Sequence, residues 1–472
     1  MAIQSNASDI SIRKLSIRTA SGEHNLNPFL QELSIYENMF QPALSANLII
    51  SDSHNMPYKL PIVGEETVDI DLSLTGFSDG YDSETWSIKP PPFHVNSITQ
   101  REHFMPKAHR FGIDLISEKY MSSIHSKISR SYNNNTISDI VSSIYYNYLH
   151  DGVYDLRVEP TEGNERVVIP NLSPLDAINW LAKRAIPING ISVNYLYYET
   201  MHGSNFVCLN SLAKKEPIFT FLQRPRIGDS TGVEDFQNNE IKIAEFEFIK
   251  QFDKEENTKI GVYSSKLITH DIVTKKIRQY EYGGLEEWDA YNHCGKFPPL
   301  SNSDVETKSS HIKRTSFAPY VLGKTTNKIE SKSLNGMVDS RVEFFPKHNN
   351  MYALSANDTY DNYVENWKLR RNNHIGVYDG LNIALKSPGN SGLRVGHTVN
   401  VFLPSPEATD SDKQSDNIDD KFLSGKYMVT AIKHVFSRLK PNDPKLSYNM
   451  IVEVSKDGYD DYVPPRKSRK DS

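Results

Sequence analysis

The residues of this sequence that could do chemistry are few and widely spaced. His293 and Cys294 are adjacent and carry an imidazole and a thiol, which could bind a metal ion or serve as base and nucleophile. Neither has partners at ligand spacing, so a structural role is the interpretation we favour. His103 and His109 flank Pro106 between two expected strands, and isolated histidines of this kind are more often surface residues than ligands.

Two further patterns are typical of hydrolases. Glu286 and Glu287 could form the carboxylate pair of a glycoside hydrolase, but adjacency does not set the separation across a sugar that such catalysis needs. The stretch Gly228–Gly232 matches GxSxG, the turn that exposes a nucleophilic serine between a strand and a helix. Pro225 interrupts the approach, and residues 233–240 lack an apolar helical face, so we interpret the stretch as a turn between strands.

Phosphate-binding loops are missing as well. The sequence contains neither the GxxxxGK motif with a following Ser or Thr nor a GxGxxG motif after a strand. We therefore predict no catalytic, cofactor-binding or metal-binding residue, no cofactor, and a chain that is not an enzyme.

The composition restricts the class of protein. The chain has 472 residues, which predicts about three or four domains. Its 25 tyrosines and 20 phenylalanines favour strands, and a net charge of −6 argues against a specific nucleic-acid site. Two cysteines without a CxxC pair fit folding in a reducing cytosol. The polar N-terminus and the lack of an apolar window of about 18 residues predict no signal peptide and no membrane segment.

Hydrophobic periodicity divides the chain into regions of different structure, and the fold class that we expect is α+β, predominantly β. Six or seven short strands in the first region predict an antiparallel barrel or sandwich. Residues 284–350 show little periodicity, and the loop 405–420 is rich in Asp and Ser. The regions are 1–116 (β), 117–215 (α+β), 216–250 with 376–460 (β), 251–375 (mixed, inserted) and 461–472 (a basic tail expected to be disordered).

The clearest local pattern is a short amphipathic helix. Ser173 can cap it with its hydroxyl, Pro174 suits the first helical position, and Asp176 lies three residues after the cap. Pro187 is expected to close it. We interpret it as a core-packing helix, because apolar residues recur along one face. These are Leu175, Ile178, Leu181, Ala182 and Ala185.

Two more helices are expected. Thr136 is a plausible cap with Asp139 three residues later, and an apolar stripe follows it. The stretch Asp358–Arg371 also has helical periodicity.

Several segments, in order along nearly the whole chain, resemble one family. Val168–Ala185 is similar to a segment of the central baseplate hub subunit of contractile-tailed (myovirus) phages, through its Ile-Pro, Ser-Pro, Ala-Ile and Arg-Ala pairs. The insertion 284–350 and the acidic loop 405–420 depart from the family pattern, which leaves the domain borders open. The other similar segments are Leu33–Pro42, Ile50–Ser53, Leu60–Glu66, Gly261–Asp271, Leu393–Val399, Leu423–Thr430 and His434–Phe436.

The resemblance implies a structural virion protein, the central hub of a tail baseplate. Such hubs form a homotrimer with two tube-like antiparallel β-barrels per subunit, which gives a pseudo-sixfold ring. On this reading 1–116 is the first barrel and 216–250 with 376–460 the second. The ring would adapt the hexameric tail tube to the trimeric cell-puncturing spike and nucleate tail assembly in the host bacterial cytoplasm. Implied partners are the chain itself, the tail tube protein and the spike or needle protein, with baseplate wedge and tape-measure proteins as further candidates.

Two alternatives remain. One is a spike-base module of another contractile injection system, such as type VI secretion. That family usually continues into a repetitive β-prism needle, and this sequence stops at Ser472 without such a repeat. The other is a tail-associated cell-wall hydrolase, which the scarcity of catalytic patterns disfavours.

Overall fold

The computed structural model has an α+β fold that is predominantly β, as the sequence predicts. The residues that it describes are 9–52, 60, 62–74, 87–105, 108–150, 152, 154–188, 193–223, 240–284, 287–299, 305–307, 311–312, 325–326, 330–332, 340–346, 364–405, 419–438 and 445–461. No helix of the described chain is long and apolar enough to cross a membrane.

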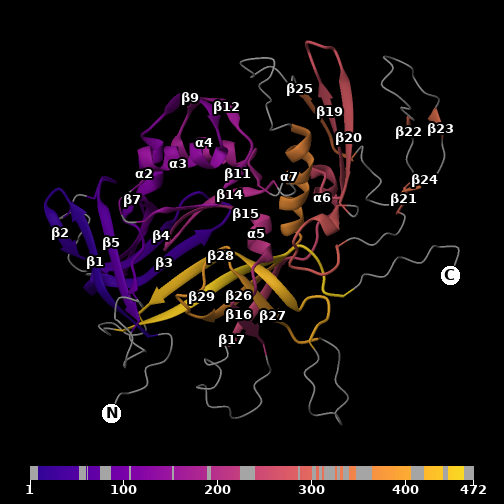
Figure 1. The fold of residues 1–472 in the computed structure, drawn as a ribbon. Coiled ribbons are helices and arrows are strands. Elements are labelled where there is room, and N and C mark those ends of the chain that lie inside the picture. The colour runs from indigo at the N-terminus through magenta and orange to yellow at the C-terminus, as the bar shows by residue number, and fades with distance from the viewer. Residues whose placement is uncertain are drawn as a thin grey trace, which may run out of the picture.

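Strands from both ends of the chain form one main sheet (Figure 1). They are β1 (Asp9–Thr19), β3 (Leu30–Asn38), β4 (Ser45–Asp52), β5 (Thr67–Leu74), β7 (Phe93–Met105), β8 (Ala108–Ser117), β28 (Gly425–Ser437) and β29 (Lys445–Lys456). The short β2 (Gly22–Asn25) pairs with β1, and β6 (Ser87–Ile88) pairs with β5. A 3-10 turn, Asn27–Phe29, leads into β3.

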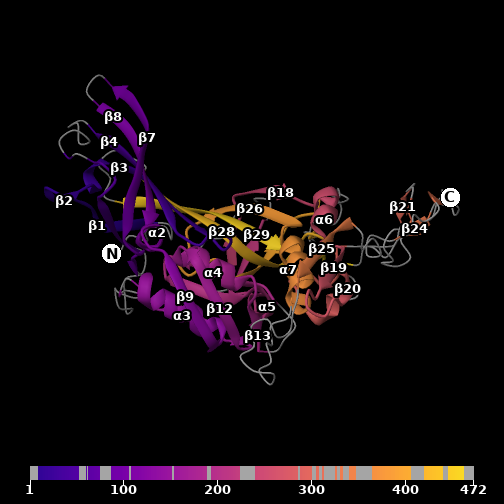
Figure 2. The same cartoon turned by 90° about the horizontal axis from the view of Figure 1, so that it is seen from above.

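The eight long strands pair in a closed circuit. The order is β28, β3, β4, β8, β7, β5, β1 and β29, and β29 pairs back with β28. Every pairing in the circuit is antiparallel. Alternation explains the burial, since Val68, Ile70 and Leu72 of β5 face the core while the residues between them do not. In Figure 2 the β7–β8 hairpin extends away from the body.

A second circuit shares β28 and β29 with the first. Its other strands are β16 (Phe219–Leu222), β17 (Glu240–Lys242), β18 (Glu245–Lys250), β26 (Leu381–Pro388) and β27 (Thr398–Phe402). β16 pairs with β27, β27 with β28, and β29 with β26. The segment 240–250 closes the circuit. Ile243 N–H donates to the carbonyl oxygen of Leu222 in β16, and Ala244 N–H donates to the carbonyl oxygen of Lys386 in β26. One hairpin therefore belongs to both groups of strands.

The α+β region has a core of its own beside the first circuit (Figure 1). Its elements are α2 (Glu118–Ile124), β9 (Ile128–Asn135), α3 (Ile137–Tyr148), β10 (Leu156–Val158), β11 (Thr161–Glu162), β12 (Glu165–Leu172), α4 (Pro174–Ala182), β13 (Ile186–Pro187), β14 (Tyr195–Thr200), β15 (Gly203–Cys208) and α5 (Leu209–Lys214). The short α2 and α5 have no clear signal in the sequence.

Both predicted caps of this region are confirmed. Ser173 Oγ accepts a hydrogen bond from Asp176 N–H at 3.3 Å and donates to the Asp176 carboxylate at 2.6 Å. Thr136 Oγ1 accepts from Asp139 N–H at 3.2 Å. The apolar face of α4 is buried, and Leu181 is fully covered. The helix ends at Ala182, before Pro187, which lies in β13.

The inserted region contains a small sheet covered by a helix. Its main elements are α6 (Lys254–Ile260), β19 (Ser264–His270), β20 (Ile277–Gly283), a 3-10 turn (Trp288–Ala290), β25 (Val342–Pro346) and α7 (Val364–Tyr378). Two short antiparallel pairs join β21 (Val305–Thr307) to β24 (Glu330–Lys332) and β22 (His311–Ile312) to β23 (Thr325–Thr326). Leu267, Tyr282, Val364 and Leu369 form its core.

The helix expected at 358–371 is α7, but it continues to Tyr378. The extension is held by tertiary contacts rather than by helix propensity. Asn373 donates a hydrogen bond to the Val262 carbonyl and accepts one from the Tyr282 hydroxyl at 3.0 Å. Residues 358–363, the tail 462–472 and most of the loop 405–420 lie outside the described residues.

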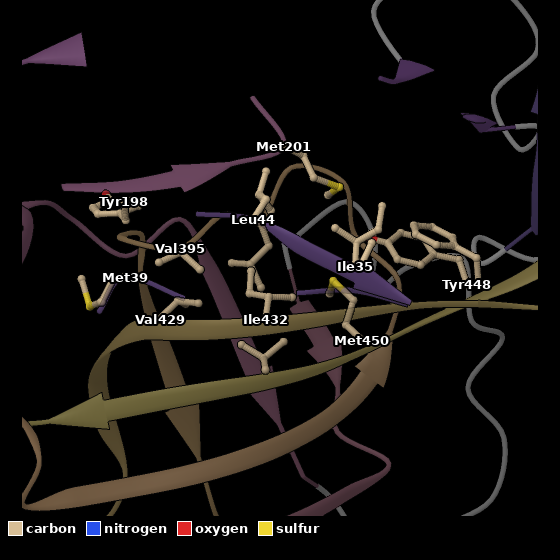
Figure 3. Packing of buried hydrophobic residues seen from close by; sticks show 14 of the residues in the cluster. Ile35, Met39, Leu44, Tyr198, Met201, Val395, Val429, Ile432, Tyr448 and Met450 are labelled. Carbon is tan, nitrogen blue, oxygen red and sulfur yellow. The ribbon is translucent and has the colours of Figure 1, made fainter. Parts of the chain in front are cut away.

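The largest core connects the strand circuits to the α+β region (Figure 3). Ile35 comes from β3 and Leu44 directly precedes β4, while Ile432 and Met450 come from the shared hairpin. Met201, after β14, packs into the same cluster. This continuous core is what fixes the α+β region against the circuits.

Candidate functional site

The structure places His293 and Cys294 among buried hydrogen bonds that join two segments of the chain, and not in a catalytic site. His293 Nδ1 lies 2.6 Å from Asp457 Oδ2, and Nε2 lies 2.7 Å from the Trp288 carbonyl oxygen. Both partners are hydrogen-bond acceptors, so the ring bridges the 3-10 turn and the residue that follows β29. The ring stacks on Trp288 with centroids 3.5 Å apart.

Asp457 is the acceptor at the centre of these hydrogen bonds. Burial alone would raise its pKa, but the hydrogen bond and charge of His293 and the N–H groups of Cys294 and Gly295 hold it below its usual value. Burial raises the pKa of the Cys294 thiol well above its ordinary range. A thiol that stays protonated is a poor nucleophile, so the geometry fits fastening of 288–295 to the end of β29.

The remaining candidates from the sequence do not come together. Glu287 pairs with Arg370, with Oε2 and Nε 3.3 Å apart, while Glu286 and the Gly228–Gly232 stretch lie outside the described residues. His103 and His109 occupy opposite positions in the β7–β8 ladder. Within the described part of the chain, no group of three or more His, Cys, Asp or Glu residues is arranged to hold a metal ion.

A buried polar cluster joins the α+β region to the first strand circuit, and we call it the polar junction. It consists of Glu37, Lys119 and Glu199, which are all at most 2% exposed. Lys119 Nζ lies 3.2 Å from Glu199 Oε1 and donates to Ser204 Oγ at 3.3 Å. The other Glu199 oxygen accepts from Leu44 N–H at 3.1 Å. The pair thus links α2 and β14 to the start of β4.

Glu37 at the end of β3 holds two further segments. Its Oε1 accepts from Met201 N–H at 2.8 Å, and its Oε2 accepts from Val395 N–H at 3.4 Å. Burial raises the pKa of Glu37 to about 7, even though these hydrogen bonds and the charge of Arg394 oppose the rise. Its carboxylate therefore ties the α+β region and the segment before β27 to the sheet.

A buried histidine lies beside Glu37. His434 Nδ1 is 2.8 Å from the Tyr448 hydroxyl, and Nε2 is 4.0 Å from Glu37 Oε1. Burial lowers the pKa of His434 to about 3, so the ring is neutral. Tyr448 is visible in Figure 3 at the edge of the apolar core.

Sequence reasoning missed the polar junction, although one signal was present. Glu37 continues the inward alternation of Leu33 and Ile35, which places a carboxylate on the buried face of β3. Glu199 lies in β14, whose six residues are all buried. A charge in such a position needs a partner, but nothing in the sequence indicates that the partner is Lys119.

The comparisons with known proteins concern the fold. No family model and no curated protein matches the sequence. The tail protein from Neisseria meningitidis MC58 is similar in structure, with a TM-score of 0.50 and 10% identity over 95% of this chain and 97% of that one. The 43 kDa tail protein of prophage MuSo2 from Shewanella oneidensis has a TM-score of 0.49 and 9% identity, over 94% and 98% of the two chains.

A Francisella PdpA–VgrG complex is also similar, with a TM-score of 0.41, 12% identity, and coverage of 98% of this chain and 54% of that one. At these identities the likeness defines the fold alone. The chain has the fold of a tail protein along nearly its whole length. The resemblance found in the sequence is confirmed at that level.

Proposed function

We propose that this chain is a structural subunit of the central hub in a contractile-tail baseplate and that it acts as a homotrimer. The observation that carries the proposal is the pair of strand circuits that share the β28–β29 hairpin. Three copies of a chain with two such circuits would present six, which is the match that a hexameric tube needs. The tail-protein fold supports the same function.

The proposed role is that of an adapter without catalytic activity. One side of the ring would contact the tail tube protein and the other the central spike, with wedge and tape-measure proteins as further partners. The chain would be located in the tail baseplate of the virion, after assembly in the host cytoplasm. The buried Cys294 and the hydrogen bonds at both ring nitrogens of His293 fit a structural role for this adjacent imidazole and thiol.

We also propose the domain plan given by the sequence. Residues 1–116 and 216–250 with 376–460 are the two tube-like units, 117–215 is an α+β domain, and 251–375 is inserted. The shared hairpin means that the two tube-like units are fused by pairing such as that of Ile35 in β3 with His434 in β28.

Exposed apolar side chains indicate where another copy would bind. Five of them lie at one end of the small sheet of the inserted region, and we call them the apolar rim. His270, the last residue of β19, pairs with Ile277 on one side and Pro346 on the other, which brings the two edges together there. Exposed apolar side chains that gather at one end of a sheet are typical of subunit contacts. The apolar rim is Ile272, Val273, Ile277, Phe344 and Phe345.

The proposal is tested by measuring the oligomeric state of the purified full chain. Light scattering coupled to size exclusion should give three times the monomer mass of 53.7 kDa, and electron microscopy should show a ring with six similar lobes. Phe344→Glu, at a side chain that is 57% exposed, should give monomers whose circular dichroism spectrum matches that of the wild type. Val168→Glu is the matched control, since Val168 is 66% exposed but lies in β12. A wild-type monomer at micromolar concentration would rule out the trimer.

A further inference from the structure

A cavity lies where the α+β region meets the segment before β27, and its walls are basic. Its volume is about 140 Å³, far above the roughly 10–15 Å³ that one water needs. Three fixed cations line it, one from each of three distant parts of the chain: Arg157, Lys215 and Arg394. His202 and His397 complete the set, which we call the basic pocket.

The charges of the basic pocket are not balanced. In the part of the chain that the structure describes, none of the three cations has a carboxylate oxygen within 4.0 Å. Asp155 is the one acidic residue in the lining, and it accepts a hydrogen bond from the Tyr146 hydroxyl at 3.4 Å. Three positive charges and one negative charge leave a net charge of +2. Like charges around a partly buried cavity repel one another, and an anion would relieve that repulsion.

The two histidines add hydrogen-bonding capacity. His397 Nδ1 accepts from Arg394 N–H at 3.2 Å, so the proton of the neutral ring is on Nε2. His202 Nε2 is buried, and it has no hydrogen-bond partner among the described residues. A buried nitrogen without a partner at the wall of a cavity indicates that a ligand or solvent atom completes it.

Close packing and a hydrogen bond fix the wall of the basic pocket in place. Gly396 has a φ of +83°, and a Cβ there would lie 2.3 Å from the Tyr198 hydroxyl oxygen, so the segment passes close to β14 only as glycine. The next residue back, Val395, is anchored through its N–H to Glu37. The position of Arg394 is therefore set by the polar junction behind it.

We propose that the basic pocket binds a phosphate dianion, either free phosphate or the phosphate group of a monoester. A net charge of +2 matches a dianion. Two guanidinium groups and an ammonium group offer the charge-assisted donors that phosphate oxygens accept. This site is independent of the hub function proposed above.

Binding should take up protons. Burial, followed by the charge of Arg394, lowers the pKa values of His202 and His397 to about 4. A bound dianion favours the protonated rings, so it raises both pKa values and binding tightens as pH falls. The other charged groups that face these rings are Lys215, Arg157 and Asp155, with Glu37 behind Val395 and Glu159 near Lys215.

Calorimetric titration of the full chain tests the site. With inorganic phosphate as the probe, in chloride buffer of fixed ionic strength, we expect saturable binding of one phosphate per chain. Arg394→Gln should weaken the affinity by roughly tenfold or more. Arg278→Gln removes an exposed cation from β20 and should leave the affinity unchanged. No binding of phosphate, or an equal loss in both variants, overturns the proposal.

Asp155→Asn gives the opposite sign. Loss of the one carboxylate should tighten phosphate binding several-fold, which a merely structural role of Asp155 would not do. Weaker binding in Asp155→Asn contradicts the site.

Sulfate keeps its double charge from pH 7.5 to pH 5, so its affinity should rise over that range if the histidines take up protons. Adenosine monophosphate separates the two sources, because a monoester site binds it at least as tightly as free phosphate, whereas a site for free phosphate excludes it.

Discussion

The two sides of β14 differ in whether the charged groups next to them are paired. Glu199 points into the polar junction, whereas its neighbours Tyr198 and Thr200 line the basic pocket, as expected when successive side chains of a strand face opposite directions. In the junction each charge has an oppositely charged or hydrogen-bonding partner. In the pocket the cations converge, and among the described residues none of them has a carboxylate oxygen within 4.0 Å. The difference indicates that one side of the strand is structural and the other is arranged for a ligand.

The largest expected effect comes from breaking the junction. Lys119→Met leaves Glu199 buried without its ion-pair partner, and such losses cost about 3–5 kcal/mol. Chemical denaturation of the variant should show this decrease in the free energy of unfolding. The double variant Lys119→Met, Glu199→Gln removes the stranded charge and should recover most of the loss. A cost below 1 kcal/mol for the single variant would mean that the pair is not desolvated.

Glu37 provides the next test, through pH. Its folded pKa of about 7 lies above the unfolded value, so its contribution to stability is complete below pH 4.5 and is lost as pH rises to 7. The loss amounts to roughly 3 kcal/mol. Glu37→Gln should remove this dependence, so that the variant gains stability relative to the wild type between pH 4.5 and pH 7. Parallel stability curves for the two proteins would contradict the assignment.

His434 makes the free energy of unfolding depend on pH in the opposite direction. Its folded pKa is lowered to about 3, so its contribution is present above pH 6.5 and is lost as pH falls toward 3. At pH 5 the loss is about 2 kcal/mol. His434→Gln should therefore make the protein less sensitive to acid between pH 6.5 and pH 5, whatever its constant cost from the lost contact with Tyr448. Urea denaturation at fixed pH values measures both slopes, and an unchanged slope would place a charged ring in the core.

Local structure could be predicted from the sequence, because its causes are local. Ser173 and Asp176 lie three residues apart, and their hydrogen bonds form whatever surrounds them. The alternation of Val68, Ile70 and Leu72 likewise fixes which face of β5 is buried. The α+β class follows from such patterns.

Strand partners and both polar sites could not be predicted in this way. Alternation gives the face of a strand but not its neighbour, and the pairing of Ile35 with His434 joins residues about 400 positions apart. The basic pocket has the same origin, since Arg157, Lys215 and Arg394 meet only after the α+β region docks on the shared hairpin. The sequence shows each as an ordinary surface cation.

The smallest expected effect on stability is at the pocket, and it completes the comparison with the junction. Arg394→Gln removes one positive charge, as Lys119→Met does, yet in phosphate-free chloride buffer the free energy of unfolding should change by less than about 0.5 kcal/mol. The lost cation has no ion-pair partner within the described parts of the chain, and its removal lessens repulsion from Arg157 and Lys215. Added phosphate should then raise the melting temperature of the wild type but not that of the variant, because only a binding-competent fold gains from the ligand. A large loss of stability in chloride alone would instead make Arg394 a structural residue, and the two sides of β14 would no longer differ.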